Sequence, residues 1–114
     1  LACGGIGKSG KRILKPETVA LFRKAVITDG QPARDFALFN RTGYAYGLGV
    51  RVLVDGNTSP GPVGEFGWDG AAGAYALIDT DRELSVFYAG HILNFSDHYY
   101  GIHPKLRNLI YECL

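Results

Sequence analysis

The chain has 114 residues, enough for one domain that buries roughly two thirds of the surface its unfolded chain would expose. Apolar residues make up 46% and charged residues 20%, a balance typical of a globular protein, and no apolar run is long enough to span a membrane. The formal net charge of +1, without a dense stripe of basic side chains, argues against a nucleic-acid-binding protein.

Two features of the composition concern the wider context of the chain. The only cysteines, Cys3 and Cys113, lie near opposite ends, and the sequence leaves open whether they pair. The chain contains no methionine and begins without a signal-peptide pattern. We therefore expect a piece of a longer protein.

The first element predicted in chain order is a helix. The glycine-rich residues 1–11 precede it and are expected to be a loop, because their GGIGKSG run lacks the spacing of a phosphate-binding loop. Pro16 and Glu17 favour a helix start, and apolar residues at spacings of three and four predict a helix to about Ile27. Residues 33–41 are ambiguous and could form a loop with one helical turn.

Four strands and a second helix are predicted next. Alternating apolar residues predict a strand over 46–54, and further strands are expected from residue 64 up to a corner that begins at residue 68, over 74–78 and over 84–89. The last of these has apolar residues on both faces, which predicts a sheet covered on both sides. A helix from Pro104 is expected to bury Leu106, Leu109, Ile110 and Cys113, with Lys105, Arg107 and Asn108 facing outward. These elements predict an α+β fold, an antiparallel sheet of about four strands flanked by N- and C-terminal helices.

The chain is organised around the stretch GEFGWDGAAGAYALID. Its glycine-rich corner, residues 68–73, lets a second backbone or a ligand approach closely. From the residues alone this corner is either a tight hairpin or a binding edge, and Trp68 is either an apolar lid over the sheet or part of such an edge.

Several stretches together carry a resemblance to a known family. The order of GYAYGLGVRV, EFGWDGAAGAYALIDTDRELSVFYAG and IHPKLRNLIYECL is similar to the C-terminal part of the penicillin-recognising serine hydrolases, which include class C β-lactamases, DD-peptidases and family VIII esterases. The resemblance implies that residues 1–114 form a single partial domain of a β-lactamase-like fold. It also implies a bacterial protein, in either the cytoplasm or the cell envelope.

The most specific part of the resemblance is a triplet on one strand. In the family this triplet is Lys-Thr-Gly, His-Thr-Gly or, in the esterases, Trp-x-Gly, and the matching residues here are Trp68, Asp69 and Gly70. The resemblance implies that these three bind substrate and that the backbone N–H of Ala71 helps to form an oxyanion hole. The implied partner is a small-molecule acyl substrate, with no cofactor and no metal.

Departures from the family pattern refine this expectation. Trp68 replaces a cation and Asp69 replaces a hydroxyl, so we expect the parent to act poorly on β-lactams and better on uncharged esters. The chain contains no Ser-x-x-Lys motif, so it lacks the nucleophile and we expect it to be inactive alone.

Other polar residues favour structural roles at this level. The histidines His91, His98 and His103 lack a metal-ligand spacing and are interpreted as loop polarity or local capping. Arg51 is interpreted as a solvated or paired cation. The alternatives to a hydrolase fragment are a non-catalytic binding module and, less favoured, a small carbohydrate-binding domain. A partial sheet would leave the strand over 84–89 as an unpaired edge, which predicts a homo-oligomer.

Overall fold

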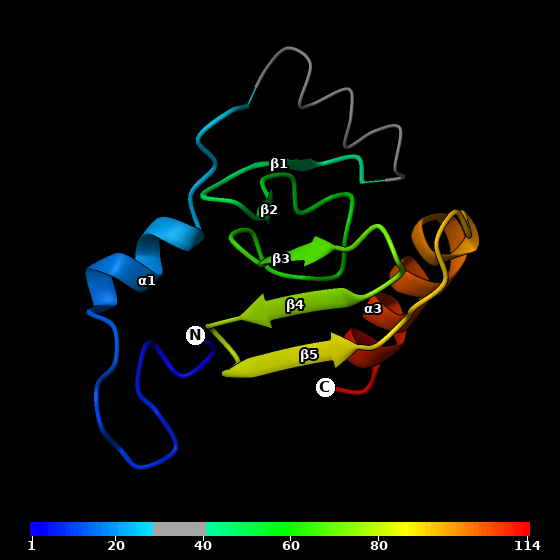
Figure 1. Ribbon diagram of the computed structural model, residues 1–114. Coiled ribbons are helices and arrows are strands. Elements are labelled where there is room, and N and C mark those ends of the chain that lie inside the picture. Colours follow the sequence, from blue (N-terminus) through cyan, green and yellow to red (C-terminus); the bar gives the residue numbers. More distant parts are fainter. Residues whose placement is uncertain (29–40) are drawn as a thin grey trace.

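A computed structural model describes residues 1–28 and 41–114. The ambiguous segment before residue 41 lies outside the described residues. Figure 1 shows a single sheet with α1 at one end of its strands and α3 near the other. The elements, in chain order, are α1 (Pro16–Phe22), β1 (Tyr44–Tyr46), β2 (Arg51–Leu53), β3 (Phe66–Asp69), β4 (Tyr75–Asp79), β5 (Leu84–Tyr88), the π-helix η1 (His98–Ile102) and α3 (His103–Glu112).

The sheet is an antiparallel meander of five strands in the order β1-β2-β3-β4-β5. The predicted α+β class is confirmed, with one strand more than expected. The additional strand arises because the predicted strand over 46–54 is two strands, β1 and β2, joined by a turn. Gly49 adopts a positive φ of 70° in that turn, and the Gly47 N–H donates to the carbonyl of Val50. Glycine permits this reversal, which the apolar alternation alone conceals.

The first helix is shorter than predicted. It ends at Phe22 rather than near Ile27, and the backbone N–H groups of Val26 and Ile27 both donate to the carbonyl of Tyr46. The chain therefore leaves the helix to pair with β1. Phe22 stacks on Phe66 of β3, with ring centroids 5.7 Å apart, and this contact joins α1 to the sheet.

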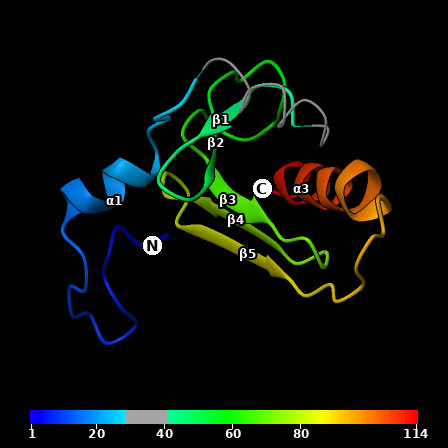
Figure 2. The same cartoon turned by 45° about the horizontal axis from the view of Figure 1, so that its top comes forward.

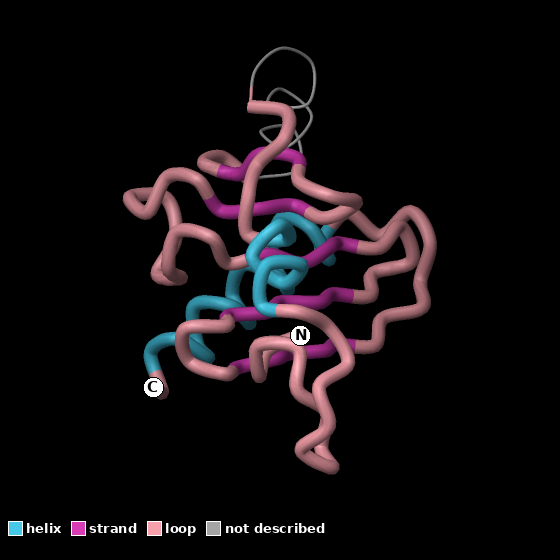
Figure 3. The backbone as a smooth tube through the Cα atoms, turned by 90° about the vertical axis from the view of Figure 1, so that its left-hand side faces the viewer, coloured by secondary structure: helices cyan, strands magenta, loops and turns pink. Residues whose placement is uncertain are grey.

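The two faces of the sheet differ in what covers them. Helix α3 lies against one face, here called the inner face, while α1 and the N-terminal segment lie at the end of the strands where β4 turns into β5 (Figures 2 and 3). The buried apolar residues come mainly from the strands and are Ala2, Val19, Tyr44, Ala45, Val52, Leu53, Phe66, Tyr75 and Leu77. On β5, Phe87 is 74% exposed, so the prediction of a sheet covered on both sides is wrong at this strand among the described residues.

Helix α3 presents a different side to the sheet than its apolar pattern predicted. Its buried residues are His103 and Arg107, whereas Leu109 is 53% exposed and Cys113 is also exposed. The prediction that Arg107 faces outward is wrong, because its Nη1 donates to the hydroxyl of Tyr44 on β1 at 3.2 Å. Polar groups on the inner face of the sheet bind polar groups on the helix.

Two further observations concern the edge and the helices. Strand β5 is an edge strand of the described sheet, as predicted, and its pairing with a second chain stays a prediction. None of the helices in the described part of the chain could cross a lipid bilayer, since the longest has only ten residues.

Candidate functional site

Strand β3 places the residues of the triplet on opposite faces of the sheet. Successive side chains of a strand alternate, so Trp68 lies on the outer face and Asp69 on the inner face. Trp68 is 41% exposed, and its ring meets that of Tyr46 edge-on at 5.6 Å. The side chain of Asp69 is only 11% exposed. The two side chains of the triplet therefore face different surroundings.

The second half of β3 has a strand partner on one side only within the described residues. Strand β2 pairs with Phe66 and Gly67, whereas Trp68 and Asp69 pair with β4 alone.

A tight turn, residues 70–73, follows β3 and leads into β4. The Gly70 N–H donates to the carbonyl of Ala74 at 2.7 Å, and the Gly73 N–H donates to the carbonyl of Gly70 at 2.8 Å. Ala71 is exposed at the tip, and its N–H donates to no group among the described residues. The corner is therefore a hairpin turn, and the N–H of Ala71 is among its backbone donors that have no acceptor within the described residues.

The ring of His98 packs against this turn. Gly73 has a φ of 89°, and a Cβ at this position would lie 2.2 Å from Nε2 of His98, so a side chain does not fit there. The corner therefore needs glycine at position 73 for both conformation and space. His98 is 3% exposed, and neither of its ring nitrogens has a hydrogen-bond partner in the described structure.

The carboxylate of Asp69 is the centre of a buried polar cluster, here called the Asp69 cluster. Its Oδ1 lies 2.5 Å from Nη2 of Arg41 and 2.8 Å from Nδ1 of His103. Its Oδ2 lies 3.3 Å from Nη1 of Arg51. The side chains of Arg41, Arg51 and His103 are all at most 2% exposed. Each element of this cluster comes from a different part of the chain.

These contacts decide the charge state of Asp69. Burial alone would raise the pKa of the carboxyl, but the hydrogen bond from His103 and the nearby Arg51 and Arg41 hold that pKa well below its usual range. Asp69 is therefore ionised at neutral pH, and its charge is compensated by protein cations.

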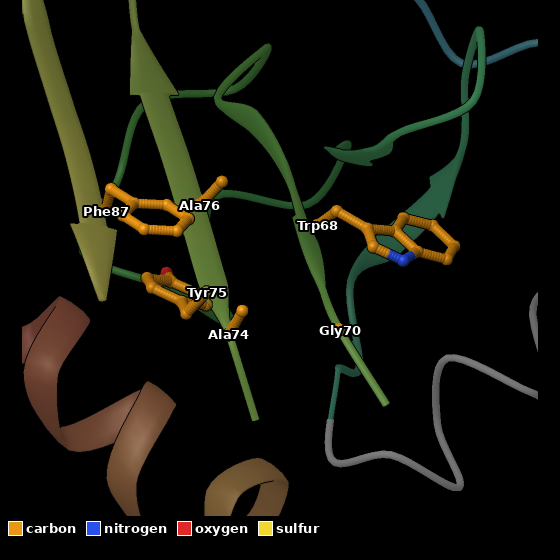
Figure 4. Close-up of a pocket in the computed structure, with 6 residues that line it drawn as sticks. All are labelled: Trp68, Gly70, Ala74, Tyr75, Ala76 and Phe87. Carbon is orange, nitrogen blue, oxygen red and sulfur yellow. The ribbon is translucent and has the colours of Figure 1, made fainter. Parts of the chain in front are cut away.

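A shallow apolar hollow lies on the outer side of the strands beside the turn. It has a volume of about 200 Å³ and is lined by Trp68, Gly70, Ala74, Tyr75, Ala76 and Phe87. In Figure 4 these residues come from β3, the following turn, β4 and β5, with the indole of Trp68 turned toward β1 and β2. Two members of the triplet thus line the same hollow.

The remaining candidates from the sequence do not join this site. Cys3 and Cys113 are free and exposed. His91 is exposed, whereas His98 and His103 contact the turn formed by residues 70–73. Within residues 1–28 and 41–114, no group of three or more acidic, histidine or cysteine side chains is placed to hold a metal ion.

Sequence comparisons with known proteins found two relatives but no family. No protein-family model matches the chain. Two uncharacterised proteins of Mycobacterium tuberculosis, MT1414 of strain CDC 1551 and Rv1367c of strain H37Rv, are each 36% identical to it over 86 residues. The matched segment is 69% of this chain and 21% of either relative, so the chain matches about a fifth of the length of these relatives.

Among solved structures, EstCE1 is similar over nearly the whole chain. EstCE1 is described as a hydrolase with promiscuous acyltransferase activity, and it superposes with a TM-score of 0.70 and 23% identity. The match covers 96% of this chain and 27% of EstCE1. The chain therefore has the fold of one portion of a larger hydrolase.

Sequence reasoning missed the residues that surround Asp69. His103 was interpreted as loop polarity or capping, yet it is fully buried, with Nδ1 beside Asp69 and Nε2 2.9 Å from the carbonyl of Gly73. One signal was present, since His103 directly precedes Pro104 at the start of a predicted helix and so lies at a defined position. Arg51 is indeed a paired cation, bound within the inner face.

Proposed function

We propose that this chain is the C-terminal portion of a serine hydrolase of the penicillin-recognising type, which hydrolyses acyl substrates through an acyl-enzyme. The observation that carries the proposal is the likeness to EstCE1, a hydrolase, across 96% of the chain. The resemblance of the Trp-Asp-Gly triplet to the family motif supports it independently. In this proposal, residues 1–114 are a partial domain, and the nucleophile belongs to another part of the parent.

The local geometry fits the role of a substrate wall. Gly70 and Trp68 line the hollow, and Ala71, an exposed residue whose N–H donates to no group among the described residues, follows directly in the turn. An acyl carbonyl lying in the hollow beside Gly70 would find this N–H as a donor. Pre-placed donors of this kind stabilise the charge that develops on the carbonyl oxygen in the transition state.

We propose uncharged esters as the preferred substrates. The family cation that attracts a substrate carboxylate is replaced by Trp68, an apolar ring that is partly exposed at the hollow. Asp69 stands where the family has a hydroxyl. Its charge is bound by Arg41 and Arg51 and is not directed at the substrate. A chromogenic cephalosporin hydrolysed as fast as a good ester would overturn this preference.

The test uses the full-length protein that contains this chain and the substitution Gly70→Ala. A Cβ at Gly70 would lie 3.4 Å from the Ala74 carbonyl oxygen, an ordinary contact, so the fold should tolerate it. We expect kcat/KM for p-nitrophenyl butyrate to fall by about tenfold or more, because a displaced reacting group loses its alignment.

The matched control is Gly56→Ala. Among the described residues, a Cβ there would meet only Cγ2 of Val63, at 3.5 Å, and Gly56 lies in a different loop. We expect this variant to hydrolyse the ester like the wild type. Wild-type protein without ester hydrolysis would instead favour the second candidate, a non-catalytic binding module, which is consistent with the lack of a Ser-x-x-Lys motif in the chain.

A further inference from the structure

The turn that carries Ala71 is held at both ends by side chains from the C-terminal segment. The hydroxyl of Tyr99 donates to the carbonyl of Gly70 at 2.9 Å. At the other end, Nε2 of His103 lies 2.9 Å from the carbonyl of Gly73. These two side chains come from η1 and α3, far from the turn in sequence, so tertiary structure restrains the turn.

The first of these contacts acts on a single peptide unit. The Gly70 carbonyl and the Ala71 N–H belong to the same planar, trans peptide group, in which they point in opposite directions. The two donors to this carbonyl, the Tyr99 hydroxyl and the Gly73 N–H, therefore fix together the direction of the N–H on the other side. A hydrogen bond to the carbonyl also polarises the group and makes its N–H a stronger donor.

The second contact supports the first from a rigid base. His103 is 0% exposed, and its ring lies against those of Tyr75 and Tyr88, at centroid distances of 4.9 and 6.0 Å. Nδ1 is bound to Asp69, the last residue of β3, while Nε2 reaches Gly73, just before β4. One side chain thus spans the two ends of the hairpin turn.

We propose that Tyr99 is a positioning residue that orients the Ala71 N–H toward the substrate carbonyl, with His103 bracing the turn. This inference rests on the proposed function, because it gives the Ala71 N–H the role of oxyanion donor. Neither side chain touches the substrate in this scheme. Both act through the backbone of the turn.

The first test is kinetic and uses Tyr99→Phe in the full-length protein. The substitution removes one hydroxyl and keeps the ring. We expect kcat and kcat/KM for p-nitrophenyl butyrate to fall together by about tenfold, with KM unchanged, because an oxyanion donor acts mainly in the transition state. The control is Tyr111→Phe, which removes a hydroxyl that binds Asp79 instead of the turn, and it should leave both constants unchanged.

The second test needs no catalysis. Labelling with ¹³C-carbonyl glycine and ¹⁵N-alanine selects Gly–Ala peptide bonds in an NMR spectrum, and this chain has two, Gly70–Ala71 and Gly73–Ala74. Tyr99→Phe should shift the Gly70–Ala71 signal and leave the other in place. His103→Asn, which shortens the side chain away from Gly73, should shift the Gly73–Ala74 signal.

The two tests separate the possible failures. An unshifted Gly70–Ala71 signal in Tyr99→Phe, or an active enzyme whose kcat is unaffected by that change, overturns the inference. A wild-type protein that hydrolyses no ester overturns the proposed function, and the NMR signal then decides whether Tyr99 orients this peptide group.

Discussion

The two buried carboxylates of the inner face, four residues apart, differ in how they are bound. Asp69 has two arginine partners and one histidine partner, and the contacts with Arg41 and His103 are no longer than 2.8 Å. Glu65, which directly precedes β3, is 1% exposed, whereas the side chain of Asp69 is 11% exposed, and the contacts of Glu65 are long. Its oxygens lie 3.4 and 3.5 Å from the hydroxyl of Tyr44 and 3.5 Å from Nη2 of Arg51.

This difference in contacts gives the two groups opposite pKa shifts. Burial raises the pKa of Glu65, and the charges of Arg51 and Arg107 offset that effect only in part. For Asp69 the effect of burial is outweighed, and the pKa is lowered. Burial alone therefore does not determine the charge of an acidic side chain here, since the distance to its cationic partners decides the outcome.

The largest predicted effect comes from removing the better-bound carboxylate. Asp69→Ala leaves the buried guanidinium groups of Arg41 and Arg51 without their shared partner. We expect the free energy of unfolding to fall by about 3–5 kcal/mol, the usual cost of breaking a buried ion pair on one side. Urea unfolding would measure this change, and a loss below about 1 kcal/mol would show that Asp69 is not bound as described.

A smaller effect is predicted for the pH dependence of stability. Because the folded pKa of Asp69 is lowered, its contribution is present above the unfolded pKa of about 3.9 and is lost as the pH falls below it. Because the folded pKa of Glu65 is raised, its contribution is present below about pH 4.3 and is lost as the pH rises through the folded pKa.

Urea midpoints measured across this pH range for the wild type and two variants would separate the contributions. In Asp69→Asn the acid-induced loss should be reduced. In Glu65→Gln the loss on raising the pH should be reduced. Parallel curves for all three proteins would contradict the opposite shifts.

The smallest effect is predicted for Glu65→Gln at neutral pH. The amide keeps the shape of the side chain and removes a charge whose burial is costly, while Arg51 retains the carbonyl of Ala76 and Asp69 as partners. We expect the free energy of unfolding to change by no more than about 1 kcal/mol. A loss as large as that of Asp69→Ala would show that the two carboxylates are equivalent after all.

The strands show how much of the fold the sequence could predict. The hairpins around 70–73 and 80–83 follow from turn residues between apolar runs, so β3, β4 and β5 were placed to within about two residues. The division of β1 from β2 was missed because Gly47 and Gly49 fit an alternating pattern as well as a turn. The local pattern favoured one continuous strand. In the structure the chain instead forms two strands, and Tyr46 at the end of β1 also pairs with Ile27.

The polar inner face could not be predicted from periodicity. Patterns assign charged residues to the solvent side, since lone buried charges are rare. Arg51, Arg107 and Asp69 are buried because they bind one another or their neighbours across the sheet and α3, and such pairing depends on contacts between distant parts of the chain. The site residues suggested by the family motif were located in the hairpin, but their surroundings required the fold.

Arg51 gives the inner face a property that neither carboxylate has alone. Its guanidinium contacts Glu65 through Nη2 and Asp69 through Nη1, so the two acids compete for one cation. A proton taken up by Glu65 removes that competition and strengthens the pairing of Arg51 with Asp69. Acid–base events in the middle of the sheet are thereby energetically coupled to the strand end that carries the turn, and substitutions at the two carboxylates should not be additive.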